Sequence, residues 1–292
     1  MEEAQNTMKY VNKFNGREEK KYLQSLSEEE KYEAFNEMIA DSRHIVFFGG
    51  AGVSTESGVP DFRSKDGLYN QHDVRFDAYT PEYLLSNDCL YAHSDVFYEF
   101  YRQKMNAEGI EPNAAHKKLA EMMLKGKLDC VITQNIDGLH QKAMDEMAPD
   151  AATAEKLNRK VYEIHGSTLR NYCDKCGKKY PADYIFKSEE RVPHCDCGGM
   201  IRPDVTLYGE MLPAEAWRNA ETACEQADLM IIGGTSLSVY PAANLIDYFH
   251  GRYLVLINRD ATSRGVSADL TFHDSIGKVL SQVILTPDQT DM

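Results

Sequence analysis

The chain has 292 residues, of which 42% are hydrophobic and 27% charged, and its formal net charge is −14. These values are typical of a globular protein with one large domain or two smaller ones. No apolar run approaches the roughly 20 residues of a membrane span, and so acidic a surface repels phosphate backbones, so we expect neither a membrane nor a nucleic acid as a direct partner.

The first 21 residues are polar and charged and lack the apolar core of a secretory signal. We therefore expect a cytoplasmic protein. In such a reducing compartment, the seven cysteines predict metal ligands or buried thiols and not disulfides. Four of them are clustered, whereas Cys89, Cys130 and Cys224 stand alone and are expected to be packing residues.

Residues 1–40 carry runs of Glu and Lys with sparse apolar residues. They predict an N-terminal helical extension that packs on the edge of the main domain. Ser27 and Glu30 have the spacing of a capping box at a helix start. We assign this extension a structural role.

Residues 44–48 predict a strand, and a glycine-rich turn follows at 49–58. Glycines in this place let the backbone approach a pyrophosphate at a helix N-terminus. Gly50 and Gly52 fit the dinucleotide fingerprint, but Thr55 stands at its third glycine position, and no acidic residue ends a second strand about 20 residues on. A tight structural turn would explain the same glycines.

The next loop is bracketed by Pro60 and Gly67. It can hold Arg63 against phosphates and place Phe62, a large apolar residue among polar ones, over a flat ring. The alternative is an exposed surface turn. Residues 64–112 are rich in Tyr and Phe and predict a helical module that covers a crevice. A helix follows, in which His116 is expected to be packed or exposed and not catalytic.

Residues 130–132 predict a buried strand, and mainly polar residues follow it at 133–140. Ligands bind past the carboxyl ends of strands in open α/β sheets. Side chains such as Gln134, Asn135 and Asp137 can donate and accept hydrogen bonds around a ribose and a carboxamide. A polar loop that only caps the next helix is the alternative.

Residues 161–164 predict a short strand that ends at His165. A histidine at a strand end, followed by Gly166, is well placed to act as a general base near pH 7. Taken alone, His165 would be structural. Its position beside the polar strand end at 133–137 favours the catalytic interpretation.

Cys173, Cys176, Cys195 and Cys197 form two close pairs that suit tetrahedral zinc. A site with four cysteines is closed, so the metal should be structural. His194 leaves some ambiguity about the fourth ligand, and a redox C-x-x-C is an alternative that the second pair disfavours. The zinc-ribbon small domain, residues 168–201, cannot bury a core of its own and needs the metal to fold.

The rest of the chain continues an alternation of strands and helices. Residues 202–210 return to the main domain in extended form, strands are predicted at 229–232, 253–257 and 268–272, and a closing helix at 277–285. This alternation implies an α/β fold with a doubly wound, parallel, Rossmann-like sheet. We assign that sheet to residues 41–167 and 202–292, interrupted by the zinc ribbon.

Taken together, these segments resemble the sirtuins, the NAD-dependent protein deacylases of the silent information regulator type, from about Ile45 to Leu280. Tyr208 replaces the family's usual Phe and adds a hydroxyl near the peptide groove, and the Cys195–Cys197 pair is shorter than usual. The motifs that carry the resemblance are Gly50–Ser54, Ser57–Arg63, Thr133–Asp137, His165–Gly166, the four cysteines, Tyr208–Glu210, Gly234–Leu237 and Asn258.

The resemblance implies a protein-lysine deacylase, in the first place a deacetylase, with NAD as co-substrate and one structural Zn²⁺ per chain. His165, Asn135 and Asp137 would act in catalysis, releasing nicotinamide and O-acyl-ADP-ribose. Acylated proteins or peptides would add as a strand at Tyr208, Gly209, Glu210 and Val239. NAD contacts would come from Ala51, Gly52, Thr55, Phe62, Arg63, Gln134, Asn135, Ile136, Asp137, Gly234, Thr235, Ser236, Asn258 and Ile276.

Three other functions remain open at this point. A protein ADP-ribosyltransferase is the closest in chemistry, a dehydrogenase with a zinc lobe is the second, and a zinc-ribbon module without catalysis is the third. On acyl preference, a carboxylated chain would need a Tyr-x-x-Arg pair. Three positions after Tyr98 the sequence has Tyr101, and three positions after Tyr101 it has Lys104. Neither is an arginine, so we expect a neutral acyl group.

Overall fold

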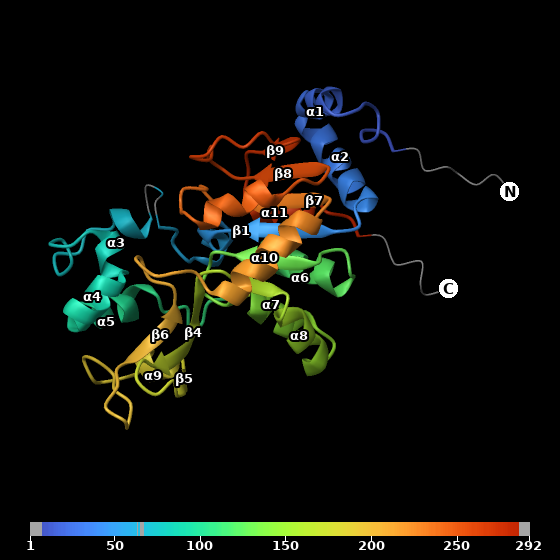
Figure 1. The fold of residues 1–292 in the computed structure, drawn as a ribbon. Coiled ribbons are helices and arrows are strands. Elements are labelled where there is room, and N and C mark those ends of the chain that lie inside the picture. The colour runs from blue at the N-terminus through green and yellow to red at the C-terminus, as the bar shows by residue number, and fades with distance from the viewer. Residues whose placement is uncertain (1–7, 63, 65–66, 286–292) are drawn as a thin grey trace.

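The computed structural model describes residues 8–62, 64 and 67–285. Its larger sheet has six strands in the order β3-β2-β1-β7-β8-β9, all paired in parallel (Figure 1). The predicted α/β class with a doubly wound parallel sheet is thereby confirmed. The strands are β1 (Ile45–Gly49), β2 (Cys130–Thr133), β3 (Val161–Glu163), β7 (Leu229–Gly233), β8 (Tyr253–Ile257) and β9 (Leu270–Phe272).

Successive side chains of these strands enter two different cores, because both faces of the sheet are covered. Phe47 belongs to one core and its neighbours Val46 and Phe48 to the other. The first face is covered by α2 (Glu28–Asp41), α6 (Ala114–Leu124), α7 (Leu139–Met147), α8 (Ala151–Asn158) and α11 (Ile276–Ser281), and the second by α10 (Ala214–Gln226) and the 3₁₀ helix η4 (Ala242–Tyr248).

The N-terminal helices protect one edge of the larger sheet. Both α1 (Arg17–Gln24) and α2 contact the edge strand β9, and the rings of Phe35 and Phe272 lie 5.7 Å apart. The predicted capping box is present at the start of α2, where the Ser27 amide donates to Glu30 Oε2 over 2.9 Å. Covering an edge strand removes its unpaired backbone groups from solvent and from other chains.

A second body of the molecule combines the helical module with a three-stranded antiparallel sheet, ordered β5-β4-β6 (Figure 1). The two share one core, in which the buried Tyr98 hydroxyl donates to the Ile201 carbonyl over 2.7 Å. The elements are η3 (Leu68–Asn70), α3 (Pro81–Leu84), α4 (Asn87–Ala92), α5 (Ser94–Lys104), β4 (Gly166–Cys173), β5 (Lys179–Pro181), α9 (Asp183–Phe186) and β6 (Ile201–Val205).

Three boundaries differ from the sequence prediction. The segment from residue 202 was expected to return to the main domain, but β6 runs to Val205 paired with β4, and the sequence holds no sign of that partner. The last strand starts at Leu270 and not at 268, and the closing helix spans Ile276–Ser281 and not 277–285.

Within the glycine-rich turn at 49–58, the backbone forms two short 3₁₀ helices. These are η1 (Ala51–Val53) and η2 (Thr55–Ser57). The amides of Gly50 and Gly52 donate to the carbonyls of Gly233 and Gly234 over 3.2 and 2.8 Å. The turn is thus tied to the end of β7.

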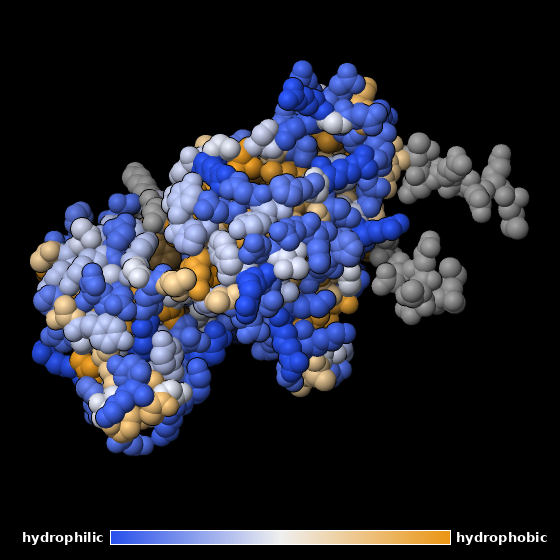
Figure 2. Space-filling view, in the orientation of Figure 1, coloured by the Kyte–Doolittle hydropathy of each residue, from blue (hydrophilic) through white to orange (hydrophobic). Residues whose placement is uncertain are grey.

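The surface and the isolated thiols agree with the composition. Figure 2 shows a largely hydrophilic face, with small apolar areas in several places, among them the region where the two bodies meet. Among the described residues, no helix is both long and apolar enough to span a membrane. The thiols of Cys89, Cys130 and Cys224 are buried in the two cores, as predicted for packing residues.

Gly52→Ala should destabilise the fold, because an added Cβ would lie 2.7 Å from the Gly234 Cα. We expect the free energy of unfolding in urea to fall by about 1–3 kcal/mol, as for other overpacked positions. Gly265→Ala is the control, since a Cβ there meets nothing within 4 Å. Equal stability of the two variants would contradict the close contact between the turns.

Candidate active site and zinc site

The polar residues singled out in the sequence lie at one edge of the larger sheet, past the carboxyl ends of its strands. The strand order reverses between β1 and β7, which is the place where open α/β sheets bind ligands. Ala51, Gly52 and Thr55 follow β1, Gln134–Asp137 follow β2, His165 follows β3, Gly234–Ser236 follow β7, and Asn258 follows β8.

Gln134 joins three of these strand ends. Its backbone amide donates to the Gly49 carbonyl over 2.9 Å, and its side-chain amide donates to Thr235 Oγ1 over 3.0 Å. Its carbonyl lies 3.0 Å from Nδ1 of His165. The residue therefore fixes the glycine turn, the loop after β7 and the histidine relative to one another.

This contact decides the protonation of the imidazole of His165. Because the Gln134 carbonyl can only accept, Nδ1 must carry the hydrogen, which leaves a lone pair on Nε2. Burial lowers the pKa of His165, and the Gln134 carbonyl opposes this only partly. The side chain is therefore neutral at pH 7, the state that a general base requires.

Asn135 and Asp137 are joined through Ser54, which was not predicted as a site residue. The Asn135 amide donates to Ser54 Oγ over 3.0 Å, and Ser54 Oγ donates to Asp137 Oδ2 over 2.7 Å. Ser54 is fully buried, and Asn135 is 9% exposed. Ser54 lies in the glycine-rich motif, but only the contact between the β1 and β2 ends reveals its partners.

Asp137 is an anchored carboxylate at this sheet edge. Burial raises the pKa of Asp137, while the Leu139 amide, 3.0 Å from Oδ1, and the Ser54 hydroxyl oppose that rise. A desolvated carboxylate gains from a ligand that brings hydroxyl donors or positive charge. Ribose hydroxyls and a nicotinamide ring have these properties.

The two glycine turns leave a surface without side chains beside this group. A Cβ on Gly50 would lie 2.9 Å from Thr235 Cβ, and one on Gly234, whose φ is +59°, would lie 2.7 Å from Ile276 Cδ1. Ile276 is buried and packs directly on Gly233 and Gly234. Together with the amide and hydroxyl groups nearby, this bare backbone fits a dinucleotide.

The loop after β7 is held in a strained form. Leu237 has a left-handed φ of 55°, which costs a residue with a Cβ about 1–2 kcal/mol. Its amide donates to Thr235 Oγ1 over 3.2 Å, and Ser236 Oγ lies 2.7 Å from Ser238 Oγ. Asn258 is partly buried, and its amide donates to the Asp260 carbonyl over 2.8 Å.

Of the two NAD contacts predicted at 62–63, the structure describes only Phe62. Phe62 is half-buried, and its ring lies 5.5 Å from that of Tyr69. The Tyr69 hydroxyl lies 3.0 Å from the Tyr208 hydroxyl, which joins this loop to the predicted peptide segment. Arg63 lies outside the described residues.

The predicted substrate residues lie in a segment that the rest of the molecule holds in place. The backbone of Tyr208 exchanges hydrogen bonds of 3.0 Å with Leu85 and Asn87. The Glu210 carboxylate forms a bidentate pair with Arg202 at 2.7 and 2.8 Å and also accepts from Asn87 Nδ2 and the Leu207 amide. Burial alone would raise the pKa of Glu210, but these donors outweigh it and leave the pKa below its usual value.

Glu210 therefore anchors the segment, and four donors occupy its carboxylate. Gly209 is exposed, and Val239, in the loop after β7, is partly exposed. An added peptide strand needs accessible backbone of this kind.

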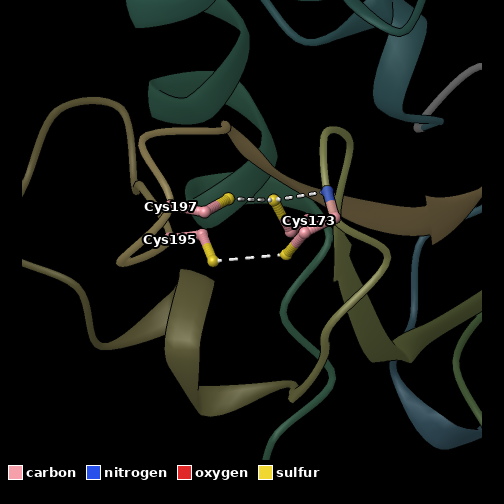
Figure 3. A group of neighbouring side chains, drawn as sticks. Cys173, Cys195 and Cys197 are labelled. Atoms are coloured by element: carbon pink, nitrogen blue, oxygen red, sulfur yellow. Dashed lines mark hydrogen bonds between the residues drawn. The ribbon is translucent and has the colours of Figure 1, made fainter.

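The four predicted metal ligands come together beside the three-stranded sheet, with Cys173 at the end of β4 and the other three in turns and loops (Figure 3). All four sulfurs lie within 4.8 Å of one another, with Cys173–Cys197 at 3.5 Å and Cys176–Cys195 at 3.7 Å. Zn–S bonds of about 2.3 Å in a tetrahedron separate the sulfurs by roughly 3.8 Å. The donor set and its spacing thus fit one Zn²⁺.

The contacts around the sulfurs favour thiolates. Tyr180 donates to Cys195 Sγ over 3.0 Å, and the Cys176 amide donates to Cys173 Sγ over 3.5 Å. His194, a possible fourth ligand in the sequence, lies instead with Nδ1 3.8 Å from Glu190 Oε2. The described cluster thus consists of cysteines alone, as a closed structural site requires.

A buried histidine pair lies behind the active site. His116 is fully buried and His140 is 1% exposed, and their ring centroids lie 4.7 Å apart. Of the two alternatives given for His116, packed or exposed, the structure shows the packed one. Burial lowers the pKa of His116 to about 4 and that of His140 well below its usual value.

Removing the metal should unfold the three-stranded sheet first. A strong chelator, or Cys176→Ser, removes the cross-link between the two cysteine pairs, so amide exchange should speed up at β4–β6 and much less at β1 and β7. Metal analysis should give one zinc per chain for the wild type. Cys224→Ala is the control with full zinc content. Unchanged exchange in the metal-free protein would contradict a structural role.

Acid should destabilise the protein through the histidine pair. The folded pKa values lie below the usual 6.5, so the unfolded chain binds protons first, and stability present above pH 6.5 is lost as the pH falls. Each histidine contributes a slope of up to about 1.4 kcal/mol per pH unit. Urea unfolding between pH 7.5 and 5.5 should show a smaller slope for His140→Leu than for the wild type.

The control for this titration is His72→Gln, because the His72 side chain is 97% exposed. Its slope should equal that of the wild type. Identical slopes for all three proteins would mean that the pair does not contribute.

The chain is similar in sequence to known proteins. A family model described as Sir2 family matches residues 50–241. A protein named NAD-dependent protein deacetylase from Clostridium acetobutylicum is 49% identical over 256 residues, 87% of this chain and 98% of the relative. A protein of the same name from Cutibacterium acnes is 50% identical over 246 residues, 84% of this chain and 94% of the relative.

Solved structures agree with these relatives. The structure described as "Sir2-p53 peptide-NAD+" has a TM-score of 0.71 and 37% identity, covering 86% of this chain and 95% of that chain. "Structure of Sir2Tm bound to a propionylated peptide" has a TM-score of 0.72 and 35% identity, covering 87% and 97%. The resemblance predicted from the motifs is confirmed: this chain belongs to the Sir2 family.

Proposed function

We propose that this chain is an NAD-dependent protein-lysine deacetylase, which removes the acetyl group from a lysine side chain and releases nicotinamide and O-acetyl-ADP-ribose. One observation carries the proposal. A neutral His165 with a free Nε2 shares its sheet edge with the Asn135–Ser54–Asp137 group, in a Sir2 family chain whose relatives are named NAD-dependent protein deacetylases.

The residues at the strand ends would contact different parts of the cofactor. NAD, when bound, supplies the sugar–base bond that is broken and the ribose that accepts the acyl group. Asn135 and Asp137 would hold its nicotinamide ribose and carboxamide, with Gln134 and Ile136 beside them. Ala51, Gly52, Thr55, Phe62 and Arg63 would lie near the pyrophosphate and ring, and Gly234, Thr235, Ser236, Asn258 and Ile276 on the adenosine side.

His165 would act as the general base. Its Nε2 accepts a proton from a ribose hydroxyl, and the Gln134 carbonyl holds the ring in the required tautomer. The lowered pKa keeps this nitrogen unprotonated at neutral pH. Positioning by the Asn135 and Asp137 side chains supplies the other large part of the rate acceleration.

The acylated peptide would bind as an added strand between Tyr208–Glu210 and the loop at Val239. The anchoring of Glu210 by Arg202 keeps that edge in place before the peptide arrives, which lowers the entropy cost of binding. We expect acetyl or another neutral acyl group, because the Tyr-x-x-Arg pair for a carboxylated chain is missing from the 98–104 sequence.

Two further proposals concern organisation and location. The proposed division is an N-terminal extension (1–40), a Rossmann-like domain (41–167 and 202–292, with the helical module at 64–112) and a zinc ribbon (168–201). The core of the larger sheet is separate from the core that the helical module and the ribbon share. A cytoplasmic location is supported by three buried free thiols and four clustered cysteines, which suit a reducing compartment.

The decisive assay follows an acetyl-lysine peptide with NAD. Deacetylation predicts peptide lighter by one acetyl group together with equimolar nicotinamide. A protein ADP-ribosyltransferase would make the target heavier, and a dehydrogenase would raise absorbance near 340 nm, roughly where the reduced cofactor absorbs. Peptide of unchanged mass in the presence of NAD would refute the proposal.

His165→Ala should lower the turnover by about 10²–10⁴, the usual contribution of a general base, while the urea midpoint stays near that of the wild type. His194→Ala is the control, because His194 is an exposed histidine on the ribbon, and it should keep wild-type turnover. In the wild type, the midpoint of the acid limb of the pH–rate profile should lie below pH 6.5, because the pKa of His165 is lowered. Normal turnover in His165→Ala would remove the base assignment.

A further inference from the structure

A second set of hydrogen bonds reaches Ser54 from the start of α6. It starts at Asn113, the N-cap of α6, and passes through His116 in the first turn of that helix. The amide of Asn113 donates to His116 Nδ1 over 3.3 Å, and His116 Nε2 lies 3.5 Å from Ser54 Oγ. His116 and Ser54 are both fully buried.

The direction of each bond follows from the backbone. An amide N–H can only donate, so Nδ1 of His116 is the acceptor and the hydrogen of the neutral ring resides on Nε2. Burial lowers the pKa of His116 to about 4, which keeps the ring neutral at pH 7. Nε2 therefore donates toward Ser54.

The hydroxyl of Ser54 is saturated by these partners. A hydroxyl has one hydrogen and two acceptor lone pairs. Ser54 accepts from Asn135 Nδ2 and His116 Nε2 and donates to Asp137 Oδ2. No lone pair is left to turn the hydroxyl another way, so its hydrogen is directed at the carboxylate.

We propose that His116 is a positioning residue for the NAD-dependent reaction, fixing the Ser54 hydroxyl and, through it, the Asp137 carboxylate and the Asn135 amide. The inference deepens the proposed function and rests on it. His116 is fully buried and would act on the ligand groups through Ser54. Its effect should therefore concern NAD selectively, since Asn135 and Asp137 are the groups assigned to the nicotinamide ribose.

The neighbouring His140 offers a built-in comparison. It is buried against His116, but neither of its ring nitrogens has a hydrogen-bond partner among the described residues. It also packs against Phe47, with ring centroids 6.4 Å apart. A substitution at His140 therefore changes the same core without removing a bond to Ser54.

The test compares two amides at position 116. Gln can place its amide nitrogen where Nε2 stands, whereas Asn reaches only the position of Nδ1 and leaves Ser54 without that donor. We expect His116→Asn to weaken NAD binding and lower kcat/KM for NAD by about fivefold or more, the size expected for one buried hydrogen bond. The KM for the acetyl-peptide should stay unchanged, and His116→Gln should retain most of the wild-type NAD affinity.

His140→Asn is the matched control, because it makes the same chemical change in the same core and should leave NAD affinity intact. NAD binding by calorimetry and the thermal midpoint are measured for every variant. In a Ser54→Ala background, His116→Asn should cause no further loss of NAD affinity, since its effect passes through that hydroxyl.

Equal losses in His116→Asn and His116→Gln, or losses that follow the thermal midpoint and affect peptide and NAD alike, would overturn the positioning role. A further loss in the Ser54→Ala background would do the same. These outcomes are distinct from failure of the proposed function, in which the wild-type chain itself neither binds NAD nor deacetylates the peptide.

Discussion

The close contact between the turns after β1 and β7 is the constraint on which the site depends. The amides of Gly50 and Gly52 donate to the carbonyls of Gly233 and Gly234, and there is no room for a side chain between them. This contact fixes the chain that follows β1. Ser54 is thereby brought under the end of β2, where it meets Asn135 and Asp137.

Local apolar runs made much of the larger sheet predictable. The strands predicted at 44–48, 130–132, 229–232 and 253–257 became β1, β2, β7 and β8, with ends shifted by at most one residue. These strands are buried on both faces, so their sequences are continuously apolar and bounded by polar or glycine residues. The strand-end residues followed from the same signal, since they are the polar groups next to those runs.

Features that depend on a distant partner were not predictable. The extension of β6 to Val205 is set by its pairing with β4, and the 3₁₀ turns after Gly50 are set by carbonyls of another strand. The sequence also gives no sign that Ser54 joins Asn135 to Asp137, or that Arg202 occupies the carboxylate of Glu210. Such contacts are known only once the strands are in place.

The strand β4 connects the base to the metal. It begins immediately after His165 and ends at the ligand Cys173, and its eight residues span about 26 Å at the usual rise of a strand. The Coulomb interaction between two charges falls with their distance, so a metal cluster at that separation would contribute little to the field at the imidazole. A zinc ion held by the four cysteines would act on the reaction by keeping β4 in place, so another tetrahedral thiophilic metal of similar radius should leave the proton chemistry of His165 unaltered.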